Sequence, residues 1–212
     1  IASLPSGSSD SAAEIQAIVN NLSSLLGGAD GVDNSQPALT PAQYQALGMS
    51  SVNTAAEASL LNDVIDVLPA SAVDTPTELA ELARIVQGIM DTAADNQASP
   101  ALTPADFALM GLSGVTADNI NAVLDAIRNT ANDGSGVDTL AELQAAINAG
   151  NAAYLQALSD LSQYAGSGTA PSASTWNLAG VEGVNASNLA AVNAFLAPVP
   201  TADSNSTAEL QA

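Results

Sequence analysis

The sequence predicts an all-α protein made of tandem three-helix units of about 64–69 residues, with partial units at both ends. Three observations lead to this prediction. A helix-start phrase occurs four times, a second phrase repeats with nearly the same period, and apolar residues follow both at helical spacing. Hydrophobic residues make up 47% of the chain, which favours packed helices over disorder.

The first phrase is a hydroxyl residue followed three positions later by glutamate. It occurs as Ser11–Glu14, Thr75–Glu78, Thr139–Glu142 and Ser206–Glu209, with the glutamates spaced 64, 64 and 67 residues apart. This is the spacing of the capping box, in which the hydroxyl accepts from the N3 amide and the carboxylate accepts from the cap amide. We therefore predict a helix start at each pair, and interpret the glutamates as capping residues rather than as a periodic carboxylate site.

Apolar residues recur every three or four positions after these caps, as one face of a long helix of about 18 residues requires. In the first three copies the faces are Ile15, Ile18, Val19, Leu22, Leu25 and Leu26, then Leu79, Leu82, Ile85, Val86, Ile89 and Met90, then Leu140, Leu143, Ile147, Tyr154, Leu158 and Leu161.

The second phrase predicts a shorter helix, with Thr40 or Thr103 as N-cap and the following proline at N1, where its missing amide costs nothing. Gly48 and Gly111 are expected to end this helix in the left-handed conformation. A diverged third copy starts at Ser172.

A middle helix is expected to follow each short one, beginning after Thr54 and after Thr116. The predicted organisation is a long helix of a preceding partial unit (1–26), two complete units (39–95 and 102–165) and a last partial unit (172–212). Partial units at both ends are expected either in part of a longer array or in subunits that complete each other head to tail. The expected partners are therefore adjacent repeats of a longer chain or copies of this one.

The charge balance excludes several classes of function. The chain has 22 acidic residues against two arginines, and its net charge of -20 disfavours nucleic acid and anionic membrane surfaces as partners. No apolar run approaches the ~20 residues that span a bilayer, so membrane insertion is not expected. Without histidine or cysteine, the commonest general base, the thiol nucleophiles and the usual zinc ligands are missing. We therefore expect a protein that is not an enzyme and has no cofactor.

Calcium is the one ion for which the sequence offers ligands. Asp30, Asp33 and Asn34 in one linker, and Asp133 with Asp138 in another, bring oxygen ligands close to glycines. However, no twelve-residue EF-hand loop is present and the spacings do not repeat, so solvated loop carboxylates are the simpler interpretation.

The aromatic residues of the short helices allow two interpretations. They are Tyr44, Phe107 and Trp176, one in each copy. A row of aromatic rings is typical of sugar-stacking surfaces, whereas a single large residue on a short amphipathic helix is typical of a core anchor. We favour the core interpretation.

The phrases Thr-Pro-Ala-Asp-Phe (103–107) and Asp-Thr-Leu-Ala-Glu-Leu-Gln-Ala (138–145), in an acidic, lysine-free, cysteine-free chain, resemble the helical tandem repeats of very large secreted bacterial surface proteins, the adhesins and related exoproteins. This resemblance implies an extracellular or cell-surface location and a structural role, and it brings no catalytic or binding motif. Residues 102–149 are also similar in helix order to the three-helix albumin-binding modules. The basic residues common in those modules are absent, so albumin binding is not implied.

The leading hypothesis for function is a spacer, biofilm-matrix or filament component outside the cell. The alternative is a recognition module that binds a host or matrix protein or a glycan, which requires an exposed apolar patch or an exposed aromatic residue.

Overall fold

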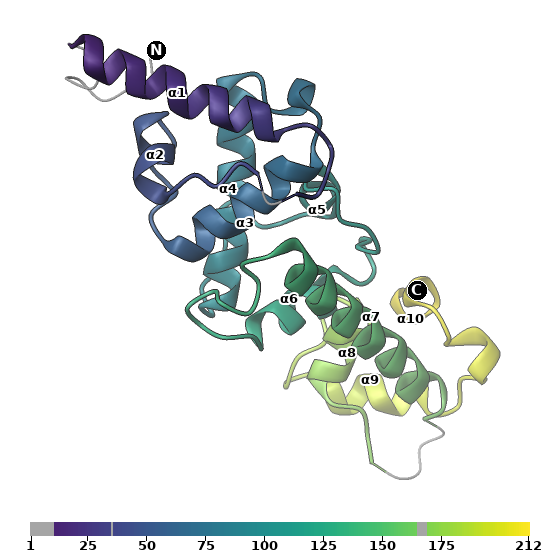
Figure 1. The fold of residues 1–212 in the computed structure, drawn as a ribbon. Coiled ribbons are helices and arrows are strands. Elements are labelled where there is room, and N and C mark those ends of the chain that lie inside the picture. Colours follow the sequence, from purple (N-terminus) through teal and green to yellow (C-terminus); the bar gives the residue numbers. More distant parts are fainter. Residues whose placement is uncertain (1–10, 35, 165–168) are drawn as a thin grey trace. The chain divides into compact units, whose positions relative to one another are not determined.

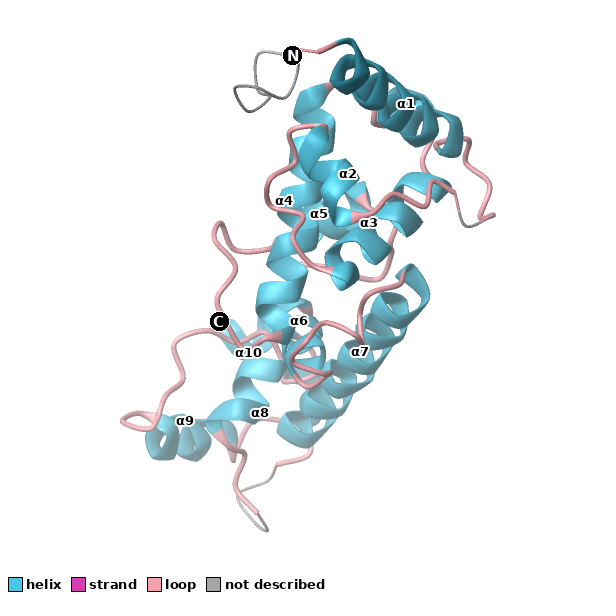
Figure 2. Ribbon diagram, turned by 60° about the vertical axis from the view of Figure 1, so that its left-hand side comes forward, coloured by secondary structure: helices cyan, strands magenta, loops and turns pink. Residues whose placement is uncertain are grey.

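The computed structural model describes residues 11–34, 36–164 and 169–212, and this part of the chain is helical without strands, as the sequence predicts (Figures 1 and 2). One isolated antiparallel bridge joins Asp30 to Pro69. The helices are α1 (Ala12–Gly28), α2 (Pro41–Ala46), α3 (Ala55–Val67), α4 (Pro76–Ala93), α5 (Pro104–Leu109), α6 (Ile120–Arg128), α7 (Leu140–Ser162), α8 (Ala173–Leu178), α9 (Leu189–Leu196) and α10 (Thr207–Gln211), with 3-10 turns at Ala70–Ala72 and Thr201–Asp203.

Each of the four hydroxyl–glutamate pairs lies at the start of a helix: the long helices α1, α4 and α7, and the short helix α10. In the first pair, the Glu14 amide donates to Ser11 Oγ (3.3 Å) and the Ser11 amide donates to Glu14 Oε2 (2.9 Å). The pairs Thr75–Glu78 and Thr139–Glu142 have the same amide-to-hydroxyl bond, at 3.3 and 3.2 Å. Ser206 also accepts from the Glu209 amide, but the Glu209 carboxylate accepts from the Asn205 amide, one residue before the cap, whereas Glu14 and Glu78 accept from the cap amide itself.

The short helices α2, α5 and α8 end in the same way. Gly48, Gly111 and Gly180 have φ angles of 94°, 79° and 75°, a conformation that glycine adopts without steric penalty. The residue after each glycine donates its amide to the carbonyl of the aromatic residue, Tyr44, Phe107 or Trp176, at 3.0–3.1 Å. This hydrogen bond between residues five positions apart is that of the Schellman motif, which ends a helix.

The middle helix α6 begins later than predicted. Thr116 was expected as its N-cap, but the helix begins at Ile120 and residues 117–119 form a turn. Asn119 closes this turn: its Oδ1 accepts from the Thr116 amide (2.7 Å) and its Nδ2 donates to the Gly114 carbonyl (2.8 Å). The prediction of a helix start at Thr116 was therefore wrong in its position, although Thr116 and Asn119 exchange both bonds of a capping box: the Asn119 amide also donates to Thr116 Oγ1 (3.4 Å).

The chain forms two compact units. The first comprises residues 1–113 with 130–144, and the second comprises residues 114–129 with 145–212. In the first unit, α1 packs on α2 and α3, and α3 packs on α4; in the second, α6 packs on α8. Helices from neighbouring predicted repeats therefore pack together, and the division cuts through the predicted unit 102–165. The repeat boundaries remain a prediction from the sequence period.

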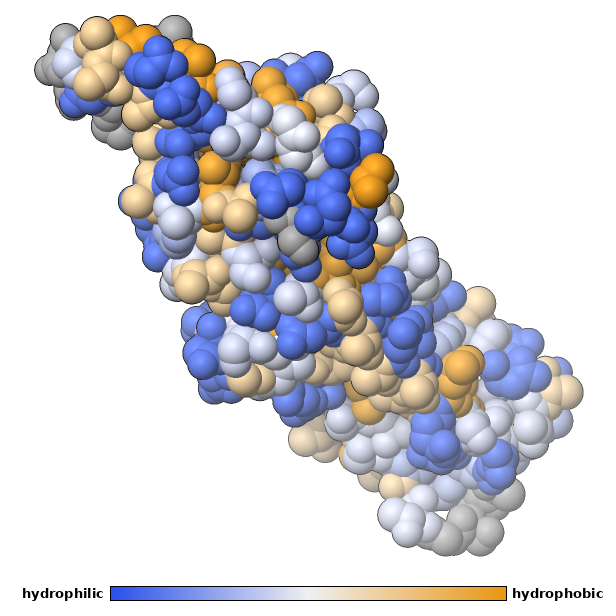
Figure 3. Space-filling model, in the orientation of Figure 1, coloured by the Kyte–Doolittle hydropathy of each residue, from blue (hydrophilic) through white to orange (hydrophobic). Residues whose placement is uncertain are grey.

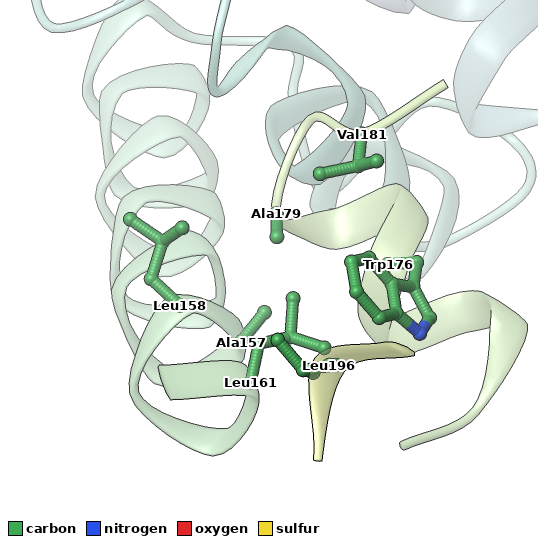
Figure 4. Packing of buried hydrophobic residues seen from close by; sticks show 7 residues of the cluster. All are labelled: Ala157, Leu158, Leu161, Trp176, Ala179, Val181 and Leu196. Carbon is green, nitrogen blue, oxygen red and sulfur yellow. The ribbon is translucent and has the colours of Figure 1, made fainter. Parts of the chain in front are cut away.

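Each unit has its own hydrophobic core. In the first unit, the buried side chains include Tyr44, Phe107 and the aliphatic residues Leu60, Leu61, Ile65, Ile85 and Ile89. In the second, α7, α8 and α9 contribute to a cluster of Ala157, Leu158, Leu161, Trp176, Ala179, Val181 and Leu196 (Figure 4). Among the described helices, none combines the length and the hydropathy needed to cross a bilayer.

Candidate functional site

The three short helices bury their aromatic residues, and two of these residues are anchored by an asparagine of the following middle helix. Tyr44 Oη donates to Asn62 Oδ1 (2.6 Å), and Asn62 Nδ2 donates to the Leu39 carbonyl (2.9 Å). In the second unit, Trp176 Nε1 donates to Asn193 Oδ1 (2.9 Å), and Asn193 Nδ2 donates to the Pro171 carbonyl (2.8 Å). The asparagine thus ties the buried ring to the residue that precedes the cap of the same short helix.

The remaining copy has apolar residues at both positions of this pair. Before each middle helix, a side-chain oxygen accepts from the backbone amide three residues earlier; the acceptors are Glu57, Asn119 and Asn188. The residues five positions after these acceptors are Asn62, Leu124 and Asn193. The copy with leucine has Phe107 in its short helix, and this ring has no polar atom that needs a partner. A buried polar group without a hydrogen-bond partner is costly. The copies with a polar ring therefore have asparagine at this position, and the copy with phenylalanine has leucine. The sequence reasoning missed these pairs, although an asparagine on the apolar face of a middle helix was a signal.

Burial of these rings excludes the sugar-stacking surface that the sequence left open. Tyr44, Phe107 and Trp176 are all buried, and burial raises the pKa of the Tyr44 hydroxyl. They act as core anchors.

The two arginines differ in their surroundings. Arg84 on α4 is held by Glu81, with Nη2 2.8 Å from Oε1, and by Asp106 on α5. Asp106 also accepts from the Thr103 amide (2.6 Å) and hydroxyl (2.7 Å). Burial opposes ionisation of Asp106, but the bonds from Thr103 and Arg84 outweigh it and hold the pKa of this carboxyl below its ordinary value. Arg84 therefore joins α5 to α4, whereas Arg128 lies 3.4 Å from Asp125 on a more exposed surface.

Of the predicted calcium ligands, Asp30 and Asp133 accept hydrogen bonds from residues two positions later, and Asn34 uses its backbone amide to bond to α3. Asp30 Oδ1 accepts from the Val32 amide (2.9 Å), and the Asn34 amide donates to Asp66 Oδ2 (2.8 Å). Asp133 accepts from the Ser135 hydroxyl (2.7 Å) and amide (3.1 Å), which lowers the pKa of its carboxyl.

The carboxylates of Asp33, Asp66, Asp138 and Glu142 lie near Asp63 of α3. Burial raises the pKa of Asp63, and the charges of Asp33, Asp66 and Glu142 raise it further, against a hydrogen bond from the Leu140 amide (3.1 Å). Burial and the neighbouring Glu142 likewise raise the pKa of Asp138. Within the described ranges, no three His, Cys, Asp or Glu side chains are grouped closely enough to hold a metal ion. Calcium binding remains a prediction.

Helix α1 has an exposed apolar face, which we call the α1 stripe: Ile15, Val19 and Leu22, with exposed fractions of 50%, 49% and 39%. Counted from the capping glutamates, the equivalent residues of α4 are Leu79, Ala83 and Val86, and all three are buried. The stripe borders a groove of about 460 Å³ whose lining includes Ile18, Leu22 and Met49. Figure 3 shows hydrophobic residues in orange along α1, at the upper left.

A second apolar surface lies on α9. Phe195 is 80% exposed and lines a groove of about 230 Å³ with Trp176, Val192 and Leu210, and the carboxylates of Asp203 and Glu209 line the same groove. The equivalent residue of Phe195 on α3, seven positions after the turn-closing acceptor, is the buried Val64. We call the surface around Phe195 the α9 groove.

Comparison with known proteins gives no relative: no family model, no curated protein and no solved structure matches the chain.

Proposed function

We propose that the chain is a structural segment of an extracellular or cell-surface protein, in which three-helix repeats form a spacer, matrix or filament component. The observation that supports it most is the recurrence of one set of contacts. Three short helices end in the same Schellman return, and the rings of two are held by the same asparagine bridge. A structure repeated along a chain supplies length and a regular surface, which a spacer needs.

Several polar groups of the described residues bond to structural partners. The four hydroxyl–glutamate pairs start helices, Asp106 holds α5 to Arg84, and Asn62 and Asn193 hold buried rings. The carboxyls with raised pKa values, Asp63 and Asp138, do not line the α9 groove or the groove beside α1. This arrangement supports a role in holding helices together rather than in catalysis.

The acidic surface supports a location outside the cell. Like charges on a chain of net charge -20 repel one another, and salt screens this repulsion beyond a distance of about 8 Å at physiological strength. A lysine-free, cysteine-free, acidic repeat therefore suits a saline and oxidising medium. This inference also rests on the resemblance to the repeats of secreted surface proteins.

One observation favours the alternative of a recognition module. Phe195 is an exposed aromatic residue, and such residues are enriched in binding surfaces. The other ring that lines the α9 groove, Trp176, is itself buried and bonded to Asn193. A foreign ligand would therefore find a single exposed ring, which is weak support for glycan or host-protein binding.

The proposed location is tested by immunogold electron microscopy of the source cells with antibodies against the purified chain. We expect gold on the surface or in the surrounding matrix of intact cells, at the same density after permeabilisation. Antibodies against a cytoplasmic protein serve as the control and label only permeabilised cells. Labelling of this chain that needs permeabilisation would contradict the proposed function.

A further inference from the structure

Three asparagines of the chain stand in the acceptor motif for N-linked glycans, Asn-X-Ser/Thr, and the structure places them in three different surroundings. The motifs are Asn21–Ser23, Asn185–Ser187 and Asn205–Thr207. A transferase recognises the asparagine amide together with the hydroxyl two residues later, so both groups must be accessible on one exposed loop. The motif alone does not separate the three asparagines, whereas burial and hydrogen bonds do.

The first motif lies inside a helix. Asn21 and Ser23 both belong to α1, and residues two positions apart do not face the same side of a helix. Asn21 Oδ1 also accepts from Gln43 Nε2 of α2 (3.1 Å), and the side chain is partly buried. The amide and the hydroxyl of this motif therefore cannot reach one enzyme site together while α1 is folded.

The last motif has an exposed asparagine but a buried hydroxyl. Asn205 is exposed, whereas Thr207 is 7% exposed. Thr207 Oγ1 donates to the Ala179 carbonyl (2.7 Å) and lies 3.0 Å from Tyr154 Oη. The folded chain thus withholds the hydroxyl that this motif needs.

The remaining motif lies on an exposed turn before α9, with its two polar groups in contact. The hydroxyl and the amide of Ser187 both donate to Asn185 Oδ1, at 2.5 and 3.0 Å, and residues 185–187 are all exposed. The space beside the turn is open, since a Cβ added at Gly183 would meet no atom within 4 Å. Residues 183–202 carry no charge, so a pyrophosphate-linked sugar donor, which is anionic, meets little local repulsion here.

Helix capping accounts for only part of this arrangement. Asn185 occupies the position that Thr54 and Thr116 occupy before the other two middle helices. Asparagine and threonine are both favoured at helix starts, so capping explains the residue at this position. Capping does not require a hydroxyl two positions later, where the other copies have Ala56 and Asp118. The hydroxyl that completes the acceptor motif is therefore particular to the third copy.

We propose that Asn185 is the acceptor of an N-linked glycan, delivered as an oligosaccharide on a lipid pyrophosphate. This inference rests on the proposed function, because the motif is used on surface loops of secreted proteins. In the transfer, Asn185 Nδ2 forms a bond to the anomeric carbon of the first sugar. The bond from that carbon to the pyrophosphate oxygen breaks, and the pyrophosphate leaves with the electron pair. Nδ2 donates one proton to the Gly183 carbonyl (3.2 Å), and its other proton passes to a base of the transferase.

Glycan transfer to the purified, folded full chain tests this site. The reagents are a synthetic lipid-pyrophosphate oligosaccharide and an oligosaccharyltransferase chosen because it modifies short peptides of all three motifs. Mass spectrometry of the intact chain and of its peptides is expected to show one added glycan, on Asn185. Asn185→Gln and Ser187→Ala should each reduce transfer to background, and Ser187→Thr, which restores a hydroxyl, should retain it. Asn205→Gln is the matched control and should leave transfer unchanged; circular dichroism checks that each variant is folded.

A wild-type chain that receives no glycan, or that receives it on Asn21 or Asn205 to the same extent as on Asn185, overturns the proposal. The chain isolated from the surface of the source cells gives a second test. We expect its peptide with Asn185 to carry the mass of a glycan, and an unmodified peptide alone overturns the proposal. Transfer to the purified chain does not depend on where cells hold it, so failure here is distinct from failure of the proposed function in the immunogold experiment.

Discussion

Tyr44 and Asn62 form the anchor of the first short helix: the buried hydroxyl donates to Oδ1 at 2.6 Å, and the same oxygen accepts from the Leu39 amide at 3.0 Å. Asn62 Nδ2 completes the bridge to the Leu39 carbonyl. One side chain thus satisfies a buried phenol and both backbone groups of the residue before the cap. The equivalent pair Trp176 and Asn193 repeats the bond to the ring and the bond to the carbonyl in the second unit, where Pro171 has no amide to donate.

The first prediction concerns the coupling of this pair. Asn62→Leu leaves the Tyr44 hydroxyl buried without a partner and is expected to lower the free energy of unfolding by about 2–3 kcal/mol. Tyr44→Phe alone is expected to cost about 1 kcal/mol. The double variant reproduces the Phe and Leu combination of the second copy, so it should be less destabilised than the sum of the two. Urea unfolding followed by circular dichroism measures the coupling, and strictly additive effects would contradict the proposed link.

The second prediction concerns the close approach of α6 and α7. A Cβ at Gly150 would lie 2.6 Å from Val123 Cα and 2.8 Å from the Ala122 carbonyl oxygen, so the helices must move apart to accept it. We expect Gly150→Ala to cost about 1–3 kcal/mol. Gly27→Ala is the control, because no atom lies within 4 Å of its added Cβ and alanine favours the helix. Fluorescence of Trp176, the single tryptophan, reports thermal unfolding of the second unit; equal midpoints for the two variants would refute the packing argument.

The third prediction concerns the ion pair between α4 and α5. Arg84→Met leaves the carboxyl of Asp106, 8% exposed, without its cation, and we expect a loss of about 1–3 kcal/mol at pH 7. Arg128→Met is the control, since exposed pairs contribute little.

The same pair sets a dependence on pH. The folded pKa of Asp106 is depressed, so its contribution to stability is present above the unfolded pKa, near 4, and is lost as pH falls through the folded value. The difference between Arg84→Met and the wild type should therefore shrink in acid. A difference that stays constant from pH 7 to pH 2 in urea titrations would rule out this role of Asp106.

The fourth prediction concerns the carboxylates around Asp63. Its folded pKa is raised, so the folded state holds the proton more firmly, and stability from this group falls as pH rises from about 4 through the folded pKa. Asp63→Asn retains an oxygen that accepts from the Leu140 amide but removes the charge. We expect a gain of about 0.5–1 kcal/mol at pH 7, reduced by added salt.

The matched control for this charge removal is Glu182→Gln, at an exposed position of the second unit. Thermal unfolding at low and high sodium chloride compares the two variants. A stabilisation by Asp63→Asn that is no larger than that by Glu182→Gln would show that general charge reduction, and not the cluster, is responsible.

Local signals made the helix starts predictable. A capping box joins residues three positions apart, so Ser11–Glu14 and Thr75–Glu78 can be identified from spacing alone. The left-handed conformation of Gly48 and Gly111 was predictable for the same reason, because a glycine just after a short helix commonly ends it in this conformation.

Contacts between distant residues were not predictable in this way. Asp33 and Asp63 are 30 residues apart, and Leu140 is 77 residues from the carboxylate that accepts its amide, so neither period nor spacing indicates that they meet. The start of α6 was placed too early because the bonds of a cap between Thr116 and Asn119 enclose a turn at residues 117–119, and the helix begins only at Ile120. The grouping of helices into two compact units depends on packing across repeats, which the period alone does not encode.

Amide hydrogen exchange measured by NMR tests the repeat account most directly. The amides of Met49, Leu112 and Val181 close the same return onto Tyr44, Phe107 and Trp176 in three places. We expect all three to be protected well above the rates of unstructured peptides, together with the indole N–H of Trp176. Exchange of any one of the three return amides at the rate of an unstructured chain would contradict the claim that this motif is repeated along the protein.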